Sequence, residues 1–169
     1  GSANVAIGTS ALNANTTASN NTAVGASALA ANTTGATNVA VGTYALDANT
    51  TTSSNVAIGH QTLTANTASN NTAVGKGAMA SNTTGDTNTA VGYLVLDANT
   101  TGTNNVAMGD NALGANTTAA NNTAFGSQAL GDNTTGTKNV AVGAYALDAN
   151  TTADDNTAVG YDALTANTT

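Results

Sequence analysis

One asparagine recurs along the whole chain at a nearly constant interval, and this periodicity limits the fold more than any other feature. The interval is 17 residues, except for one of 16 residues between Asn55 and Asn71. The consensus unit reads N-[TV]-A-[VIMF]-G-x-x-A-L-x-x-N-T-T-x-x-x, and ten copies follow it with few departures. A period this short cannot hold a pair of helices, so it indicates stacked units that each form one coil.

The residue types within the unit favour β-structure over helix. In one copy, Thr22-Ala23-Val24 is a strand-forming run that ends at Gly25, a residue suited to a sharp corner. A second short strand is expected at Ala28-Leu29-Ala30-Ala31, followed by a polar turn at 32–35. We therefore predict an all-β, parallel β-solenoid of ten 17-residue coils, with a length of about 48 Å.

The array is expected to form a single unit over residues 1–169. Neither end carries a divergent repeat of the kind that caps free-standing solenoids. We therefore expect a segment of a longer fibre.

Two asparagine columns and one glycine column do not vary between copies. An inward asparagine can bond the backbone of its own turn and the asparagine of the next coil, which forms an amide ladder. We assign this structural role to Asn4, Asn21 and Asn38 in the first column, and to Asn15, Asn32 and Asn49 in the second. The turn glycines are Gly8, Gly25 and Gly42.

Adjacent residues of both expected strands are apolar, which indicates strands that are buried on two sides. The predicted apolar core includes Val24, Leu29, Val41, Leu46, Val74, Leu96, Phe125 and Leu130. A single solenoid has only one interior, so a second apolar face needs a cover. Another copy of the chain is the simplest cover, and we expect a homo-oligomer.

The repeats resemble the YadA-like head repeats of trimeric autotransporter adhesins and the related repeats of phage tail fibres. The similarity lies in Asn4-Val-Ala-Ile-Gly8, Asn55-Val-Ala-Ile-Gly59 and Asn156-Thr-Ala-Val-Gly-Tyr-Asp-Ala-Leu164, and it extends over the whole chain. It implies a left-handed β-roll in which three chains associate side by side. The unit here is about three residues longer than the usual coil of that family, around the Asn-Thr-Thr turn.

Composition argues against several functions. The chain has two lysines, no arginine and a net charge of −7, which disfavours nucleic-acid binding. No apolar run is long enough to span a membrane. His60 is the sole histidine and is expected in an exposed turn, while Asp47, Asp97 and Asp148 should lie about 14 Å apart along one column. We therefore predict no enzyme activity, no catalytic or metal site and no cofactor.

Asn-Thr-Thr matches the N-glycosylation sequon in nine of the ten copies, although turn and ladder roles are the favoured explanation of these residues.

Three functions remain open. The first is an adhesive or structural extracellular fibre, on a cell surface or a virion, with a host surface or a glycan as receptor. The second is a self-assembling filament or matrix protein. The third, ice binding, is disfavoured because Thr16 and Thr17 are consecutive and because Thr22 alternates with Val5 and Val39 in its column.

Overall fold

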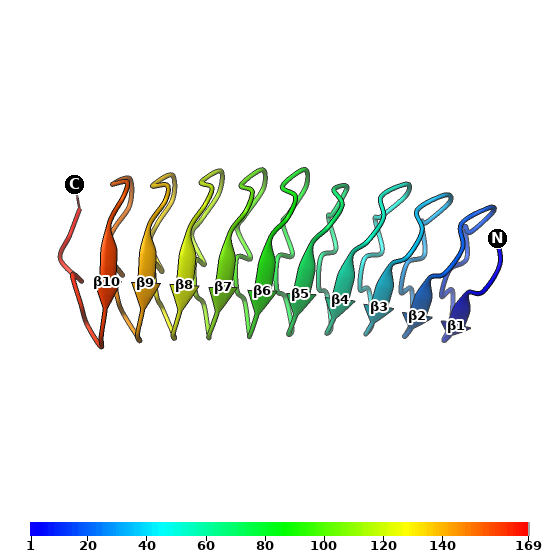
Figure 1. The fold of residues 1–169 in the computed structure, drawn as a ribbon. Coiled ribbons are helices and arrows are strands. Elements are labelled where there is room, and N and C mark those ends of the chain that lie inside the picture. The colour runs from blue at the N-terminus through cyan, green and yellow to red at the C-terminus, as the bar shows by residue number, and fades with distance from the viewer. Residues whose placement is uncertain (169) are drawn as a thin grey trace.

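The computed structural model describes residues 1–168 and shows an all-β, parallel β-solenoid (Figure 1). Each repeat contributes one three-residue strand. The strands are β1 (Val5–Ile7), β2 (Thr22–Val24), β3 (Val39–Val41), β4 (Val56–Ile58), β5 (Thr72–Val74), β6 (Thr89–Val91), β7 (Val106–Met108), β8 (Thr123–Phe125), β9 (Val140–Val142) and β10 (Thr157–Val159). No helix occurs in this part of the chain. The solenoid and tandem-repeat predictions are therefore confirmed.

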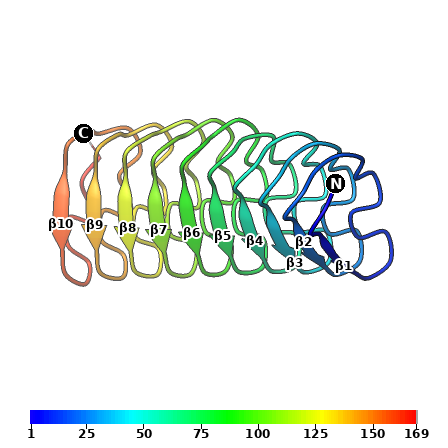
Figure 2. The same cartoon turned by 45° about the vertical axis from the view of Figure 1, so that its right-hand side comes forward.

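The ten strands form a single parallel sheet in strict chain order, which occupies one side of the rod (Figure 2). Register is identical at every step. Ala6 pairs with Ala23, which pairs with Ala40, and the same column continues to Ala158. The single 16-residue interval does not disturb this register, because Ala57 still pairs with Ala73.

The expected second strand at residues 28–31 is wrong. These residues belong to a run of turns over residues 26–31, which contains two non-glycine residues with positive φ, Ser27 at 57° and Leu29 at 51°. A left-handed residue interrupts the alternation of side chains along a strand. Ala28 and Leu29 are consequently both fully buried, although they are neighbours in sequence.

The turn segment is still bonded to the coils on both sides. The Ser27 N–H donates to the Thr9 carbonyl of the preceding coil at 2.8 Å, and the Leu29 N–H donates to the Ala45 carbonyl of the next coil at 3.0 Å. Ser27 and Leu29, the two residues with positive φ, thus direct their N–H groups to opposite neighbours. The segment therefore has the hydrogen-bonding continuity of a sheet without strand geometry.

The core is narrow and consists almost entirely of alanine and leucine. In an interior coil it comprises Ala23 from the strand together with Ala28 and Leu29 from the turn segment, all fully buried. Leu46, Leu96 and Leu130 of the predicted core lie here as well. In the same two columns, Met79 stands in place of the leucine and Val95 in place of the alanine, and both are fully buried.

Four predicted core residues lie elsewhere. Val24, Val41 and Val74 are only half-buried, and Phe125 is exposed. Each is the third residue of its strand, next to a fully buried alanine, so its side chain lies on the opposite face of the sheet. Their assignment to the core of the chain is wrong, although their strand was correctly identified.

Candidate functional site

The first asparagine column forms a continuous ladder inside the rod. The backbone N–H of Asn21 donates to Oδ1 of Asn4 at 2.9 Å, and the Asn38 N–H donates to Oδ1 of Asn21 at 2.9 Å. Nδ2 of Asn21 donates to the carbonyl of Gly35 at 2.8 Å, near the end of the same coil. Each side chain thus closes its own coil and binds the next one.

The second column forms a ladder between side chains. Nδ2 of Asn32 donates to Oδ1 of Asn15 at 3.3 Å, and Nδ2 of Asn49 donates to Oδ1 of Asn32 at 3.0 Å. Asn32 also donates to the Gly35 carbonyl at 2.9 Å, the acceptor used by Asn21. The two ladders therefore meet at one carbonyl in each coil, and within the described residues no buried side-chain N or O lacks a partner.

The glycine column forms the corner after each strand. Gly8, Gly25 and Gly42 have φ of 127°, 134° and 135°. A Cβ on Gly25 would lie 2.6 Å from the carbonyl carbon of Gly42 in the next coil. Both the backbone conformation and the close stacking of corners require glycine there.

The outer face of the sheet carries no charged side chain along the ten strands of the described chain. It presents the first and third residue of every strand, while the alanine between them faces the core. The first residues are Val5, Thr22, Val39, Val56, Thr72, Thr89, Val106, Thr123, Val140 and Thr157; the third are Ile7, Val24, Val41, Ile58, Val74, Val91, Met108, Phe125, Val142 and Val159. All twenty positions carry valine, threonine, isoleucine, methionine or phenylalanine. We call this surface the outer sheet face.

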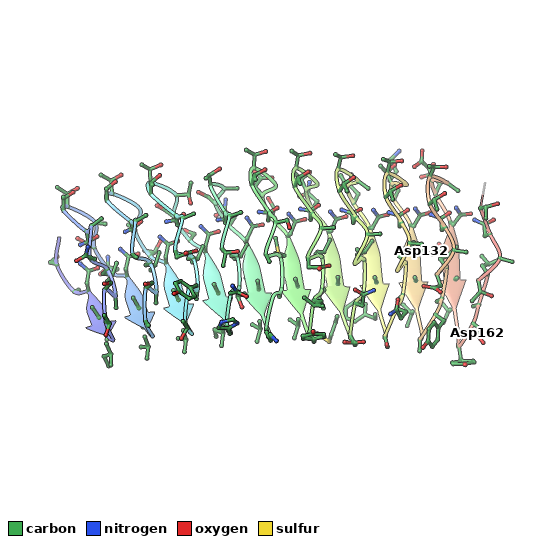
Figure 3. The ribbon with its side chains drawn as sticks, turned by 180° about the vertical axis from the view of Figure 1, so that it is seen from behind. Asp132 and Asp162 are labelled. Atoms are coloured by element: carbon green, nitrogen blue, oxygen red, sulfur yellow. The ribbon has the colours of Figure 1, made fainter. Side chains whose placement is uncertain are left out.

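An aromatic row borders the outer sheet face beyond the glycine corner. Its members are Tyr44, Tyr93, Tyr145 and Tyr161, which are between 41% and 73% exposed. Tyr145 and Tyr161 contact each other edge to face with ring centroids 6.1 Å apart, and the Lys76 ammonium lies 5.7 Å from the centre of the Tyr93 ring. Ring-bearing side chains are visible along this edge of the rod in Figure 3.

The three aspartates that directly follow the core leucine of their coils all have a raised pKa. Partial burial is the main cause that raises the pKa of Asp47, Asp97 and Asp148. For Asp148, the charges of Asp132 and Asp162 raise the pKa further. Figure 3 shows Asp132 and Asp162 at different levels of the rod. They do not form a metal-binding group, and none exists within residues 1–168.

Asp154 is shifted in the opposite direction. Its carboxylate accepts the Thr137 backbone N–H at 2.6 Å and the Thr137 hydroxyl at 2.9 Å. The hydrogen bond from the Thr137 backbone is the main cause that lowers the pKa of Asp154, and the bond from the Thr137 hydroxyl lowers it further.

The remaining residues considered from the sequence are solvent-facing. His60 is exposed at the corner after Gly59. No pocket was found over the described residues, and they contain no helix long and apolar enough to cross a membrane.

Comparison of the chain with protein-family models, with curated proteins and with solved structures finds no match. The ladders, the corner, the outer sheet face and the aromatic row are therefore interpreted from their own geometry.

Seven of the nine asparagines of the Asn-Thr-Thr sequons are fully buried inside the rod, whereas Asn15 and Asn167 of the terminal coils are half-buried. Asn32, Asn49 and Asn99 are fully buried, and their Nδ2 atoms are engaged in the second ladder. A second set of sequons, which the repeated Asn-Thr-Thr motif does not include, lies in a different environment from the buried asparagines. It consists of Asn20-Asn21-Thr22, Asn70-Asn71-Thr72 and Asn121-Asn122-Thr123. A search for every N-x-Thr, in place of the repeated one alone, would have found them.

Proposed function

We propose that the chain is a rigid structural rod in an extracellular fibre, either an adhesin head or stalk or a phage tail fibre. The observation that carries the proposal is the unbroken coupling of each coil to the next. The first ladder joins every pair of neighbouring coils, the backbone bonds of the turn segment recur along the rod, and the second ladder recurs except between Asn49 and Asn66. Such repeated short-range coupling supports a stiff rod. The resemblance to adhesin and tail-fibre repeats supports its placement on a cell surface or a virion.

We further propose that three chains pack side by side through their outer sheet faces. Ten strands at about 4.8 Å and two side chains across give this face an area on the order of 400–500 Å². A patch of that size is at the upper end of what a soluble monomer leaves uncovered. The adjoining aromatic row enlarges the contact toward the roughly 800 Å² per partner of a typical stable interface.

Sedimentation equilibrium of the full chain tests the association. We expect a trimer, and we expect Val74→Lys/Val91→Lys to shift it to monomer, because two ammonium groups would be placed on the outer sheet face. Thr84→Lys/Thr101→Lys is the matched control, since these exposed threonines lie on the loop edge of the rod. A wild-type chain that remains monomeric would refute the side-by-side trimer. Open-ended assemblies would instead favour the self-assembling filament.

Electron microscopy of the same material tests the rod itself. We expect straight, stiff particles, about 48 Å long for an isolated array. Compact or flexible particles would refute the structural-rod proposal, irrespective of the number of chains.

A further inference from the structure

Three asparagines in one exposed column carry sequons that the fold leaves open. Asn20, Asn70 and Asn121 directly precede the ladder asparagine of their coils and are exposed. Their φ values are 61°, 64° and 64°, the left-handed turn conformation that asparagine tolerates well. Among the hydrogen bonds of the described chain, none involves their side-chain amides.

The threonine of each of these sequons also faces outward. Thr22, Thr72 and Thr123 are the first residues of β2, β5 and β8, and they lie half-buried on the outer sheet face. The acceptor amide and the hydroxyl that defines the sequon are therefore both presented by the folded backbone. The Asn-Thr-Thr sequons are far less accessible. Asn32, for example, is fully buried, and its amide donates two hydrogen bonds.

We propose that Asn20, Asn70 and Asn121 are the N-glycosylation sites of the folded chain and that the more numerous Asn-Thr-Thr sequons are not. In the reaction, the Asn Nδ2 attacks the anomeric carbon of a nucleotide- or lipid-diphosphate sugar. An N–C bond forms, the C–O bond to the diphosphate breaks, and the amide loses one proton to solvent.

The positions of these residues define a regular sugar array. The three sites precede every third strand, so they lie about 14 Å apart along one edge of the rod. This edge is at the start of the strands, whereas the aromatic row lies beyond their end. The proposal concerns the single folded chain. Thr22, Thr72 and Thr123 lie on the outer sheet face, which a side-by-side trimer would cover, so the wild type and the Val74→Lys/Val91→Lys chain are tested side by side.

The chain contains its own control. Asn104 occupies the same column, is exposed and has φ of 57°, but it is followed by Asn105-Val106 and forms no sequon. Valine and threonine alternate at the first strand position, so Thr22→Val removes a sequon and Val106→Thr creates one with residues the fold already accepts there.

The test incubates the folded full chain with a sequon-specific N-glycosyltransferase and UDP-glucose, followed by intact mass measurement and glycopeptide mapping. We expect addition of one to three hexoses, confined to Asn20, Asn70 and Asn121. Thr22→Val should lose the Asn20 product, and Val106→Thr should gain a product at Asn104. The chain denatured in urea should also be modified at the Asn-Thr-Thr sequons.

Two results would overturn the proposal. One is hexose on Asn32, Asn49 or Asn99 of the folded chain at a level similar to Asn20. The other is a folded chain without modification at the three sites under conditions in which the denatured chain is modified. Circular dichroism of Thr22→Val and Val106→Thr checks that both variants keep the fold.

Discussion

At the scale of single residues, each ladder asparagine makes two bonds that require an acceptor and a donor on one short side chain. Oδ1 of Asn88 accepts the backbone N–H of Asn105 at 2.9 Å, and its Nδ2 donates to the Gly102 carbonyl at 2.8 Å. An aspartate lacks the donor, and a leucine lacks both groups. The invariance of the column follows from this double requirement in a fully buried position.

Replacement of one ladder asparagine should destabilise the whole chain. We expect Asn88→Ala to lower the free energy of unfolding by about 2–4 kcal/mol, because it leaves the Asn105 N–H buried without an acceptor and opens a cavity. Urea denaturation followed by circular dichroism measures the change. Asn13→Ala is the control, since Asn13 is exposed and Ala30 and Ala80 occupy the same column. Equal losses for the two variants would contradict the ladder role.

The corner glycines make a second prediction at this scale. A Cβ on Gly92 would lie 2.7 Å from the Gly109 carbonyl oxygen, at φ of 138°. We expect Gly92→Ala to cost about 2–5 kcal/mol, from backbone strain together with the clash between coils. Thermal denaturation compares it with Gly114→Ala, where only the flexible end of the Asn111 side chain must move and other coils carry alanine. A Gly92→Ala chain as stable as Gly114→Ala would contradict the requirement for glycine.

The sequence reveals these residues because each of them meets the same environment in every coil. It does not reveal which apolar residue faces inward. Leu29 and Val24 both recur and are both apolar, yet Leu29 is buried and Val24 is on the outer sheet face. The difference depends on the left-handed φ of Ser27 and Leu29, which hydrophobic periodicity does not encode.

At the scale of the element, the coil contains one strand where the pattern suggests two. The run Ala28-Leu29-Ala30-Ala31 has no glycine or asparagine to signal positive φ. Leucine adopts the left-handed conformation here because its N–H and its side chain are both satisfied, by the Ala45 carbonyl and by the core. Contacts with neighbouring coils thus override local preference, and a single coil read alone cannot show them.

The short coil provides a test of how local this coupling is. Thr33 and Thr34 both donate backbone N–H groups to the Thr50 carbonyl, at 2.8 and 3.2 Å. Thr50 and Thr51 have no equivalent bonds, because the next loop lacks one residue between Thr67 and Ala68. Figure 1 shows that this loop is smaller than its neighbours.

We expect the amides of Thr50 and Thr51 to exchange with solvent at least about tenfold faster than those of Thr100 and Thr101, in proportion to one lost hydrogen bond. Hydrogen exchange measured by NMR tests this. Insertion of one threonine after Thr67 should restore protection, whereas an insertion after Thr101 should not. Equal exchange at the two pairs of amides would show that the loop ladder adds no local stability.

At the scale of the whole molecule, the small number of charges makes stability depend on a few aspartates. The chain has nine acidic and two basic residues and a single histidine. The net charge of −7 adds mutual repulsion along the rod.

The pKa values of Asp47, Asp97 and Asp148 are raised in the folded chain, so folding favours their protonated form. Stability should therefore rise as the pH falls from 7 through these raised values toward the unfolded value of 3.8. Asp154 acts in the opposite sense. Its pKa is lowered, so its contribution is present above 3.8 and is lost only at more acidic pH. We expect the midpoint of thermal unfolding to increase as the pH falls from 7 toward about 3.8 and to level off below that.

The triple variant Asp47→Asn/Asp97→Asn/Asp148→Asn isolates the cause. Asn13 already occupies this column, so the amide fits the coil. At pH 7 the variant should be more stable than the wild type, and its stability should change less with pH, because desolvation no longer penalises three carboxylates. Addition of salt separates the two contributions, since it screens repulsion between exposed charges but leaves the desolvation cost. A wild-type chain that loses stability steadily from pH 7 to pH 4.5 would contradict the raised pKa values.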